Sequence, residues 1–352
     1  MKKKVAIIIS PNWKDYARKY LADCVRSIRA QDYQGEMKLF IADNQTSPES
    51  YKFLSEMVPE AELILNKTND GFAKGNNDCM KLALIQGFDY IFLINMDTVV
   101  ESDCVNELIK TAQSDKSIGA IQARLMLWPD KDKINSLGNT THFLGFGYSL
   151  GYKDQIRNYN LEISNLISYP SGAAVLFKRE VLEKVGLFDE EYWMYNEDQE
   201  LGWRIWLAGF KCVLAPKAIV FHKYEFAKSI KQYYYMDRNR IISILKCYHV
   251  LTLLLIMPAF IIMELGLILF SIKTGWFKEK LKVWKYFLTP LKWRYILKSR
   301  GQNQKLRKIK DKEIVKLISG RIWYQEIDDR KLKFINPIFD FYWRIVKKII
   351  IW

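Results

Sequence analysis

The sequence lacks several features that would assign it to familiar classes of protein. No GxGxxG motif follows the first apolar run, so the fingerprint of dinucleotide-binding proteins is absent. The apolar run Val5 to Ile9 is too short for the hydrophobic region of a cleavable signal peptide. No internal repeat or low-complexity run occurs. Five cysteines are scattered without paired spacing: Cys24, Cys79, Cys104, Cys212 and Cys247. This pattern favours reduced thiols in a cytosolic compartment over a disulfide framework.

Net charge is also absent from most of the chain. Residues 1–272 carry 32 basic and 32 acidic side chains, whereas residues 273–352 carry 22 and 7, so the whole formal net charge of +15 lies in the last segment. A neutral body with a basic tail predicts a partner with an anionic surface, for which nucleic acid and membrane are the alternatives. With 352 residues, 49% of them hydrophobic, the chain is long enough for one large domain with an appendage or for two domains.

An apolar segment of 23 residues, Val250 to Ile272, directly precedes the basic tail. It is interrupted by Pro258, Glu264 and Gly266, but it is long enough to span a bilayer. The alternative is a buried helix of a subdomain packed on the body. Because apolar residues cover all of its helical faces and tryptophans stand among the lysines that follow, we expect a membrane rather than nucleic acid as the partner.

Strand and helix patterns alternate through the first 120 residues, which predicts an α/β fold with a Rossmann-like, mostly parallel sheet and flanking helices. The expected strands are Val5–Ser10, Met37–Ala42, Glu62–Leu65 and Asp89–Asn95. Polar residues follow their ends: Asn12, Asp43, Asn66 and Asp97. In open α/β sheets this edge holds ligands, so the pattern is typical of a nucleotide site. Residues 134–152, rich in glycine and aromatics, predict a long mobile loop.

The strongest single motif ends the fourth expected strand. Asn95 and Asp97 are two residues apart, so their side chains point the same way from the strand. A hard divalent cation that holds a diphosphate requires such oxygen ligands. The alternative is a polar turn with a side-chain cap. A later strand, Val213 to Phe221, ends on His222, which could face solvent or bind a metal.

Two further motifs each allow a structural and a chemical interpretation. Glu197 and Asp198 adjoin at an expected helix start, where they could cap the helix or provide a general base. Gly71 and Gly75 allow a ligand to approach the backbone, and two asparagines, at positions 76 and 77, follow where the next helix begins. A plain glycine-rich turn is the alternative for that motif.

In their order along the chain, these motifs resemble the family 2 glycosyltransferases of the GT-A fold. The resemblance covers about residues 4–240 and is greatest to the rhamnosyltransferase-like branch that builds bacterial surface polysaccharides. The matching pieces are Asp43-Asn44, Gly71 to Asn77, Asn95-Met96-Asp97, Gly172 to Ala174, Phe188 to Glu190, Glu197-Asp198 and His222. The departures are Met96, where such enzymes often carry proline, and Gln199, where they often carry an aliphatic residue.

The resemblance implies a role for each matching position. It implies Asp198 as the catalytic base, with Glu197 as its neighbour, and Asp97 and His222 as ligands of Mg²⁺ or Mn²⁺. It implies that seven residues contact the nucleotide-sugar donor: Asn12, Asp43, Asn44, Gly71, Asn76, Asn77 and Asn95. The implied reaction is a single displacement that inverts the anomeric centre, so that no nucleophilic serine or cysteine is needed.

The resemblance also implies the partners and the location. The donor would be dTDP-rhamnose, or alternatively a UDP-hexose, and the acceptor a glycan or lipid-linked glycan in cell-surface polysaccharide synthesis. A nucleotidyltransferase or a nucleic-acid-binding protein are the rival interpretations. We expect a GT-A catalytic domain over residues 1–245 and a helical, basic, membrane-associated region over residues 246–352, at the cytoplasmic face of the membrane. A single crossing would place 22 basic residues outside, contrary to the positive-inside tendency. We therefore expect the apolar segment to enter and return, broken near Pro258, or to lie in the interface.

Overall fold

The computed structural model describes residues 2–161, 165–224, 230–323 and 330–352. The chain forms two compact units. The first comprises residues 1–139, 149–205 and 210–225, and the second comprises residues 140–148, 206–209 and 226–352.

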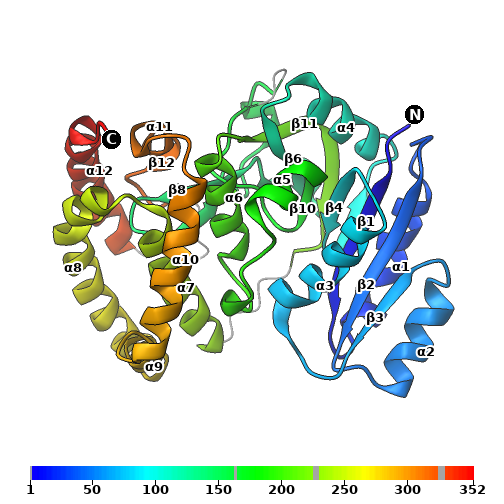
Figure 1. The fold of residues 1–352 in the computed structure, drawn as a ribbon, viewed down its shortest axis with the longest axis horizontal. Coiled ribbons are helices and arrows are strands. Elements are labelled where there is room, and N and C mark those ends of the chain that lie inside the picture. Colours follow the sequence, from blue (N-terminus) through cyan, green and yellow to red (C-terminus); the bar gives the residue numbers. More distant parts are fainter. Residues whose placement is uncertain (1, 162–164, 225–229, 324–329) are drawn as a thin grey trace. The chain divides into compact units, whose positions relative to one another are not determined.

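The first unit begins with parallel strands in the spatial order β3-β2-β1-β4, joined by helices (Figure 1). The strands are β1 (Val5–Asn12), β2 (Met37–Asn44), β3 (Glu62–Asn66) and β4 (Tyr90–Ile94). The helices between them are α1 (Tyr16–Arg29), α2 (Pro48–Met57) and α3 (Gly71–Ile85). Because β1 and β4 are buried along nearly their whole length, they read in the sequence as continuous apolar runs. The predicted alternation is confirmed here.

The second half of the sheet corrects the prediction of a mostly parallel sheet, because the sheet is mixed. Strand β10 (Ala174–Lys178) lies antiparallel between β4 and β6 (Ile118–Leu127), β11 (Lys211–His222) is parallel to β6, and β5 (Thr98–Val100) pairs antiparallel with β11. A parallel return from β6 to β10 would require a crossover connection, usually a helix. The described residues between them form no α-helix, so the chain re-enters the sheet in the opposite direction. The other helices are α4 (Cys104–Ser114), α5 (Arg179–Val185) and α6 (Glu197–Leu207).

The segment 134–152, predicted to be a long loop, instead forms three short strands. They are β7 (Ile134–Ser136), β8 (Asn139–His142) and β9 (Gly147–Ser149). Gly138 and Gly145 have φ angles of 105° and 86°, which only glycine adopts readily, and these residues turn the chain between the strands. The strand β7 pairs with β6, whereas β8 and β9 form a small sheet with β12 (Ile318–Ser319).

The second unit is mainly helical. Its helices are α7 (Ile230–Cys247), α8 (Val250–Lys273), α9 (Phe277–Phe287), α10 (Pro290–Leu306), α11 (Asp311–Ile314) and α12 (Arg330–Ile349). Helix α7 packs on α9 and α10 and therefore belongs to this unit. A functional boundary between residues 245 and 246 stays a proposal.

Helix α8 continues through Pro258, so the predicted break at that proline does not occur. Proline removes one helical hydrogen bond, but packing on both sides of the residue can compensate for the loss. Buried side chains line one face of α8 on either side of the proline, among them Ile256, Ala259 and Met263. Helix α8 has 24 residues, and a stretch of 18 of them has a mean hydropathy of 2.6, so the helix is long and apolar enough to cross a membrane by length and composition.

Three buried charged side chains and the partly buried Glu264 connect α7, α8 and α9. Asp237 and Arg240 come from α7, Glu264 from α8 and Lys280 from α9. The Nζ atom of Lys280 lies 2.7 Å from Asp237 and 2.6 Å from Glu264, and Arg240 pairs with both carboxylates. Burial would raise the pKa of Asp237, but the two cations hold it below its ordinary value. Each positive group therefore faces two negative groups, which makes this burial of charge tolerable.

Candidate active site

Asn12 and Asp43 lie side by side at the carboxyl edge of β1 and β2, as the sequence predicted. The buried carboxylate of Asp43 accepts hydrogen bonds from Nδ2 of Asn12 (2.7 Å) and from the hydroxyl of Ser50 (2.6 Å). The amide of Ala17 in turn donates to Oδ1 of Asn12 (3.0 Å). The carboxylate is thus held in one orientation, and it keeps lone pairs for a ligand because each oxygen can accept two hydrogen bonds.

Asn44 fixes the turn that precedes α3. Its Oδ1 accepts a hydrogen bond from Asn66 (3.0 Å), and its Nδ2 donates to the carbonyl of Gly71 (3.1 Å). Gly71 has a φ of 79°, and a Cβ atom there would lie 2.5 Å from the carbonyl oxygen of Trp193. Glycine is therefore required at this position by both its conformation and the close approach of residue 193.

The two asparagines of α3 differ in their contacts. The side chain of Asn76 is fully buried, its Nδ2 donates to the carbonyl of Phe72 (2.8 Å), and its Oδ1 has no hydrogen-bond partner among the described residues. Asn77 exchanges two hydrogen bonds with the backbone of Phe188 (2.9 and 3.0 Å) and donates to Glu190 (3.1 Å). Asn77 therefore fastens α3 to the segment before the acidic pair, whereas Asn76 keeps a buried acceptor for a ligand.

Asp97 and His222 are brought together across 125 residues of sequence. Nε2 of His222 lies 3.1 Å from Oδ1 of Asp97, and both side chains are largely buried. Nδ1 of His222 lies 3.0 Å from Oδ1 of Asn135. Tyr16 also approaches the site: burial raises the pKa of its hydroxyl far above the ordinary value, and a hydrogen bond to the Asp97 carboxylate raises it further.

These groups fit a divalent cation. The amide oxygen of Asn135 can only accept, so it holds the ring of His222 with Nδ1 as the donor and Nε2 turned toward Oδ1 of Asp97. A cation between Nε2 and Oδ1 would have one nitrogen and one carboxylate oxygen as ligands. Adjacent ligands of an octahedral ion with bonds of about 2.1 Å lie about 3.0 Å apart, close to the observed spacing. Oδ1 of Asn95 is buried and has no hydrogen-bond partner among the described residues. Within those residues no group of three or more acidic, histidine or cysteine side chains could hold a metal, so a bound ion would take its other ligands from the diphosphate or water.

The acidic pair lies at the start of α6, where the helix dipole favours negative charge. Burial raises the pKa of Asp198 to about 6, although hydrogen bonds from the amides of Gly172 (3.1 Å) and Gln199 (2.7 Å) oppose the rise. Burial and then the charge of Asp198 raise the pKa of Glu197 well above its ordinary value. Oε2 of Glu197 has no hydrogen-bond partner among the described residues. Burial thus makes both carboxyl groups hold their protons more tightly than free side chains do, while the two backbone hydrogen bonds favour the charged form of Asp198.

The backbone before this pair is strained. Three residues have positive φ angles, a region of backbone conformation that residues other than glycine adopt rarely: Trp193 (63°), Tyr195 (67°) and Asn196 (64°). Such conformations persist only where the surroundings hold them, and they cluster at functional sites. Here the carbonyl of Trp193 accepts a hydrogen bond from the amide of Ala73 (3.1 Å), which ties the strained segment to α3.

Residues 171–174 connect the two halves of the site. The amide of Gly172 holds Asp198, and the carbonyl of Ala173 accepts a hydrogen bond from the amide of Asn95 (3.0 Å). The acidic pair and the end of β4 are therefore joined through two consecutive residues. All the residues that the sequence predicted for the site belong to the first unit.

Sequence reasoning missed Tyr16, Ser50 and Asn135, whereas Glu190 stood in the matching piece Phe188 to Glu190 without a role of its own. Ser50 had a signal, because it forms a capping box with Ser47 at the start of α2. Tyr16 and Asn135 meet their partners only through long-range packing, and no local pattern marks them.

The chain is similar to several known proteins. The sequence profile of the family described as "Glycosyltransferase like family 2" matches residues 3–239. A protein of Mycobacterium tuberculosis named N-acetylglucosaminyl-diphospho-decaprenol L-rhamnosyltransferase is 26% identical over 203 residues, which is 53% of this chain and 66% of that protein. The O-antigen biosynthesis protein RfbC of Myxococcus xanthus is 27% identical over 234 residues, 62% of this chain and 17% of that protein. The chain thus spans less than two thirds of the length of either relative.

One solved structure extends the likeness over nearly the whole chain. The crystal structure of TarS from S. aureus superposes with a TM-score of 0.50, covering 98% of this chain and 55% of that one at 14% sequence identity. At this identity the likeness concerns the fold alone.

Proposed function

Because the chain belongs to the glycosyltransferase-like family 2, we propose that it transfers a sugar from a nucleoside diphosphate to a hydroxyl group of a glycan or lipid-linked acceptor, inverting the anomeric centre. The predicted resemblance to that family is confirmed by the match over residues 3–239. The observation that carries the proposed mechanism is the buried acidic pair at the start of α6, in which two backbone amides hold the Asp198 carboxylate.

Asp198 is the general base in this proposal. Its carboxylate takes the proton of the acceptor hydroxyl as the oxygen attacks the anomeric carbon, and the sugar–phosphate bond breaks on the opposite face. The amides of Gly172 and Gln199 hold the carboxylate in place. Burial and the charge of Asp198 raise the pKa of Glu197, which disfavours a second negative charge beside the base. A single displacement needs no covalent intermediate on the protein.

Asp97 and His222 would hold a divalent cation, Mg²⁺ or Mn²⁺, with Asn95 beside them. Bound there, the ion would neutralise the charge that develops on the departing diphosphate. Asn135 orients the ring of His222, and the hydroxyl of Tyr16 contacts Asp97. Asp43, held by Asn12 and Ser50, would accept a hydrogen bond from the base of the nucleotide, while Asn76 would offer its buried carbonyl to the donor.

The proposed donor is dTDP-rhamnose, with a UDP-hexose as the alternative. The mycobacterial relative is named for rhamnosyl transfer to a lipid-linked sugar, and the myxobacterial relative for O-antigen synthesis. Both names support an acceptor in cell-surface polysaccharide synthesis. Because these relatives are only 26–27% identical, the donor sugar of this chain is to be determined by experiment.

The second unit is proposed to attach the protein to the cytoplasmic face of the membrane. Helix α8 exposes an apolar face that includes Leu254, Ile261 and Leu265, and α12 exposes Ile338 and Phe341. The two helices pack on each other, so both faces belong to one unit. Glu264, near the middle of α8, pairs with cations of α7 and α9. A spanning α8 would carry these charges deep into the bilayer, so the helix is proposed to lie in the interface.

A panel of nucleotide sugars tests the proposed activity. Release of nucleoside diphosphate is measured for each donor with Mn²⁺, with Mg²⁺ and with EDTA, in detergent and without added acceptor. We expect hydrolysis of one donor class, dependent on a divalent cation. Equal turnover in EDTA would contradict the role of the metal, and absence of turnover for every donor would contradict the proposed activity.

A further inference from the structure

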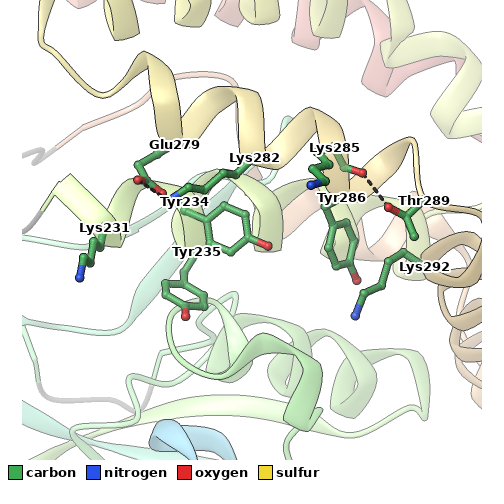
Figure 2. Close-up of a pocket in the computed structure, with 9 residues that line it drawn as sticks. All are labelled: Lys231, Tyr234, Tyr235, Glu279, Lys282, Lys285, Tyr286, Thr289 and Lys292. Carbon is green, nitrogen blue, oxygen red and sulfur yellow. Dashed lines mark hydrogen bonds and ion pairs between the residues drawn. The ribbon is translucent and has the colours of Figure 1, made fainter.

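A basic cavity of about 480 Å³ lies in the second unit, outside the candidate active site. Side chains from α7, α9 and the start of α10 line it (Figure 2). Four lysines contribute to the lining: Lys231, Lys282, Lys285 and Lys292. Its size is within the range of cavities that hold small ligands.

The lining carries an excess of positive charge. Glu279 is the one carboxylate among the nine lining residues, and its Oε1 lies 2.8 Å from Nζ of Lys282. The lining as a whole therefore carries four cationic side chains against one carboxylate. On α9, Glu279, Lys282 and Lys285 recur every three residues, so they lie along one side of the helix. Lys280 points elsewhere, into the buried charge cluster with Asp237 and Glu264.

Aromatic side chains and a fifth cation stabilise the cavity wall. Tyr234, Tyr235 and Tyr286 line the cavity, and the guanidinium of Arg238 lies 5.0, 5.3 and 5.1 Å from the centres of their rings. Arg238 is 6% exposed, so its charge adds to the potential of the cavity from behind the rings. Nζ of Lys292 lies 5.1 Å from the ring centre of Tyr286. Such contacts between cations and aromatic rings restrict the side chains that would meet a ligand.

We propose that this cavity binds a phosphate or diphosphate group, such as the one that joins a glycan to a lipid carrier. Lysine ammonium groups bind phosphate oxygens as point charges, and tyrosine hydroxyls can donate to them. Helix α9, which supplies two of the lysines, also packs on the apolar helix α8. This unit therefore offers lysines to a phosphate group and an apolar helix to a hydrocarbon chain attached to that group. The assignment to a lipid-linked acceptor rests on the proposed function, whereas the phosphate site does not.

The test compares two doubly substituted full-length proteins that lose equal charge from the same unit. In K285Q/K292Q both lysines line the cavity, and in K278Q/K298Q both lysines are exposed elsewhere on α9 and α10. Binding of inorganic pyrophosphate is measured by calorimetry in EDTA, in an Asp97→Ala background that removes the carboxylate of the proposed metal site. Binding is also measured to phosphatidylcholine vesicles doped with a polyprenyl diphosphate, or with phosphatidylglycerol at equal surface charge.

We expect K285Q/K292Q to weaken pyrophosphate binding by about tenfold, since two charge-assisted contacts are lost, and K278Q/K298Q to leave it within about twofold. If K285Q/K292Q weakens binding to polyprenyl diphosphate vesicles by the same factor, but leaves binding to phosphatidylglycerol vesicles unchanged, the ligand is a lipid headgroup. If this variant weakens only the binding of pyrophosphate, the ligand is a soluble anion.

Equal binding by the two double variants, whether both retain it or both lose it, would overturn the proposal, because general electrostatic attraction would then suffice. Donor hydrolysis by the unsubstituted protein is a separate measurement. Its absence would contradict the proposed activity and leave the pyrophosphate result unaffected.

Discussion

Substitution Glu264→Gln should destabilise the second unit strongly. The change preserves the shape of the side chain but leaves Arg240 and Lys280, both at most 1% exposed, with Asp237 as the only remaining carboxylate of the cluster. Removing one partner from a buried ion pair typically costs 3–5 kcal/mol, because the remaining charge stays buried. We expect a loss of about 3–5 kcal/mol in the free energy of opening of this unit.

Two further variants make that measurement specific. Glu313→Gln removes an acid of the same unit that forms a surface pair with Lys316, and we expect little change. The double substitution Glu264→Leu/Lys280→Leu leaves the pair Asp237–Arg240 with balanced charge. It should therefore lower the free energy of opening by less than the sum of the two single substitutions. Native-state hydrogen exchange of α7 and α9 amides is the assay, because a protein with two units need not unfold in one step. If Glu264→Gln proves as mild as Glu313→Gln, the cluster does not hold α8 in place.

Three predictions concern the metal, the base and the membrane. Asp97→Ala should abolish the turnover that divalent cations support, because the ion loses its carboxylate ligand, and cation-stimulated turnover by that variant would contradict the assignment. Burial raises the pKa of Asp198 to about 6, so the rate should fall when the pH drops below that value and the carboxylate takes up a proton. A rate that falls only near the ordinary pKa of 3.8 would contradict the effect of burial. Ile338→Asp combined with Phe341→Asp should lower partition onto anionic vesicles by at least about tenfold, because two exposed apolar side chains are lost, whereas high salt alone should not release the unsubstituted protein. Complete release by salt would leave a merely electrostatic attachment.

The sequence predicted the elements that depend on local pattern. Strands β1 to β4, their order along the chain and the polar residues at their ends follow from apolar runs and what comes after them. Asp43 and Asp97 were found in this way, because a strand end places its side chains at one edge of the sheet. The acidic residues at positions 197 and 198 were found as a helix start, although their raised pKa values depend on burial, which the sequence pattern does not show.

The features that the sequence did not predict depend on contacts between distant segments. The direction of β10 depends on its long-range antiparallel pairing with β4 and β6, and a period-two pattern does not encode strand direction. The continuity of α8 at Pro258 depends on packing along the buried face of the helix. The partner of His222, Asn135, lies 87 residues away on β7, in a segment expected to be a loop. Positive φ angles at Trp193 and Asn196 likewise result from the surrounding fold rather than from residue type.

The central claim is that Asp198 takes the acceptor proton in a sugar transfer. Its most direct test measures single-turnover transfer from the donor that the panel identifies, in parallel for the unsubstituted protein, Asp198→Asn and Glu197→Gln. We expect a loss of roughly 10²–10⁴ in rate for Asp198→Asn with donor affinity retained, and a much smaller loss for Glu197→Gln, because burial and the charge of Asp198 favour the neutral form of Glu197. A nearly normal Asp198→Asn beside a crippled Glu197→Gln would contradict the account and assign the base to the other member of the pair.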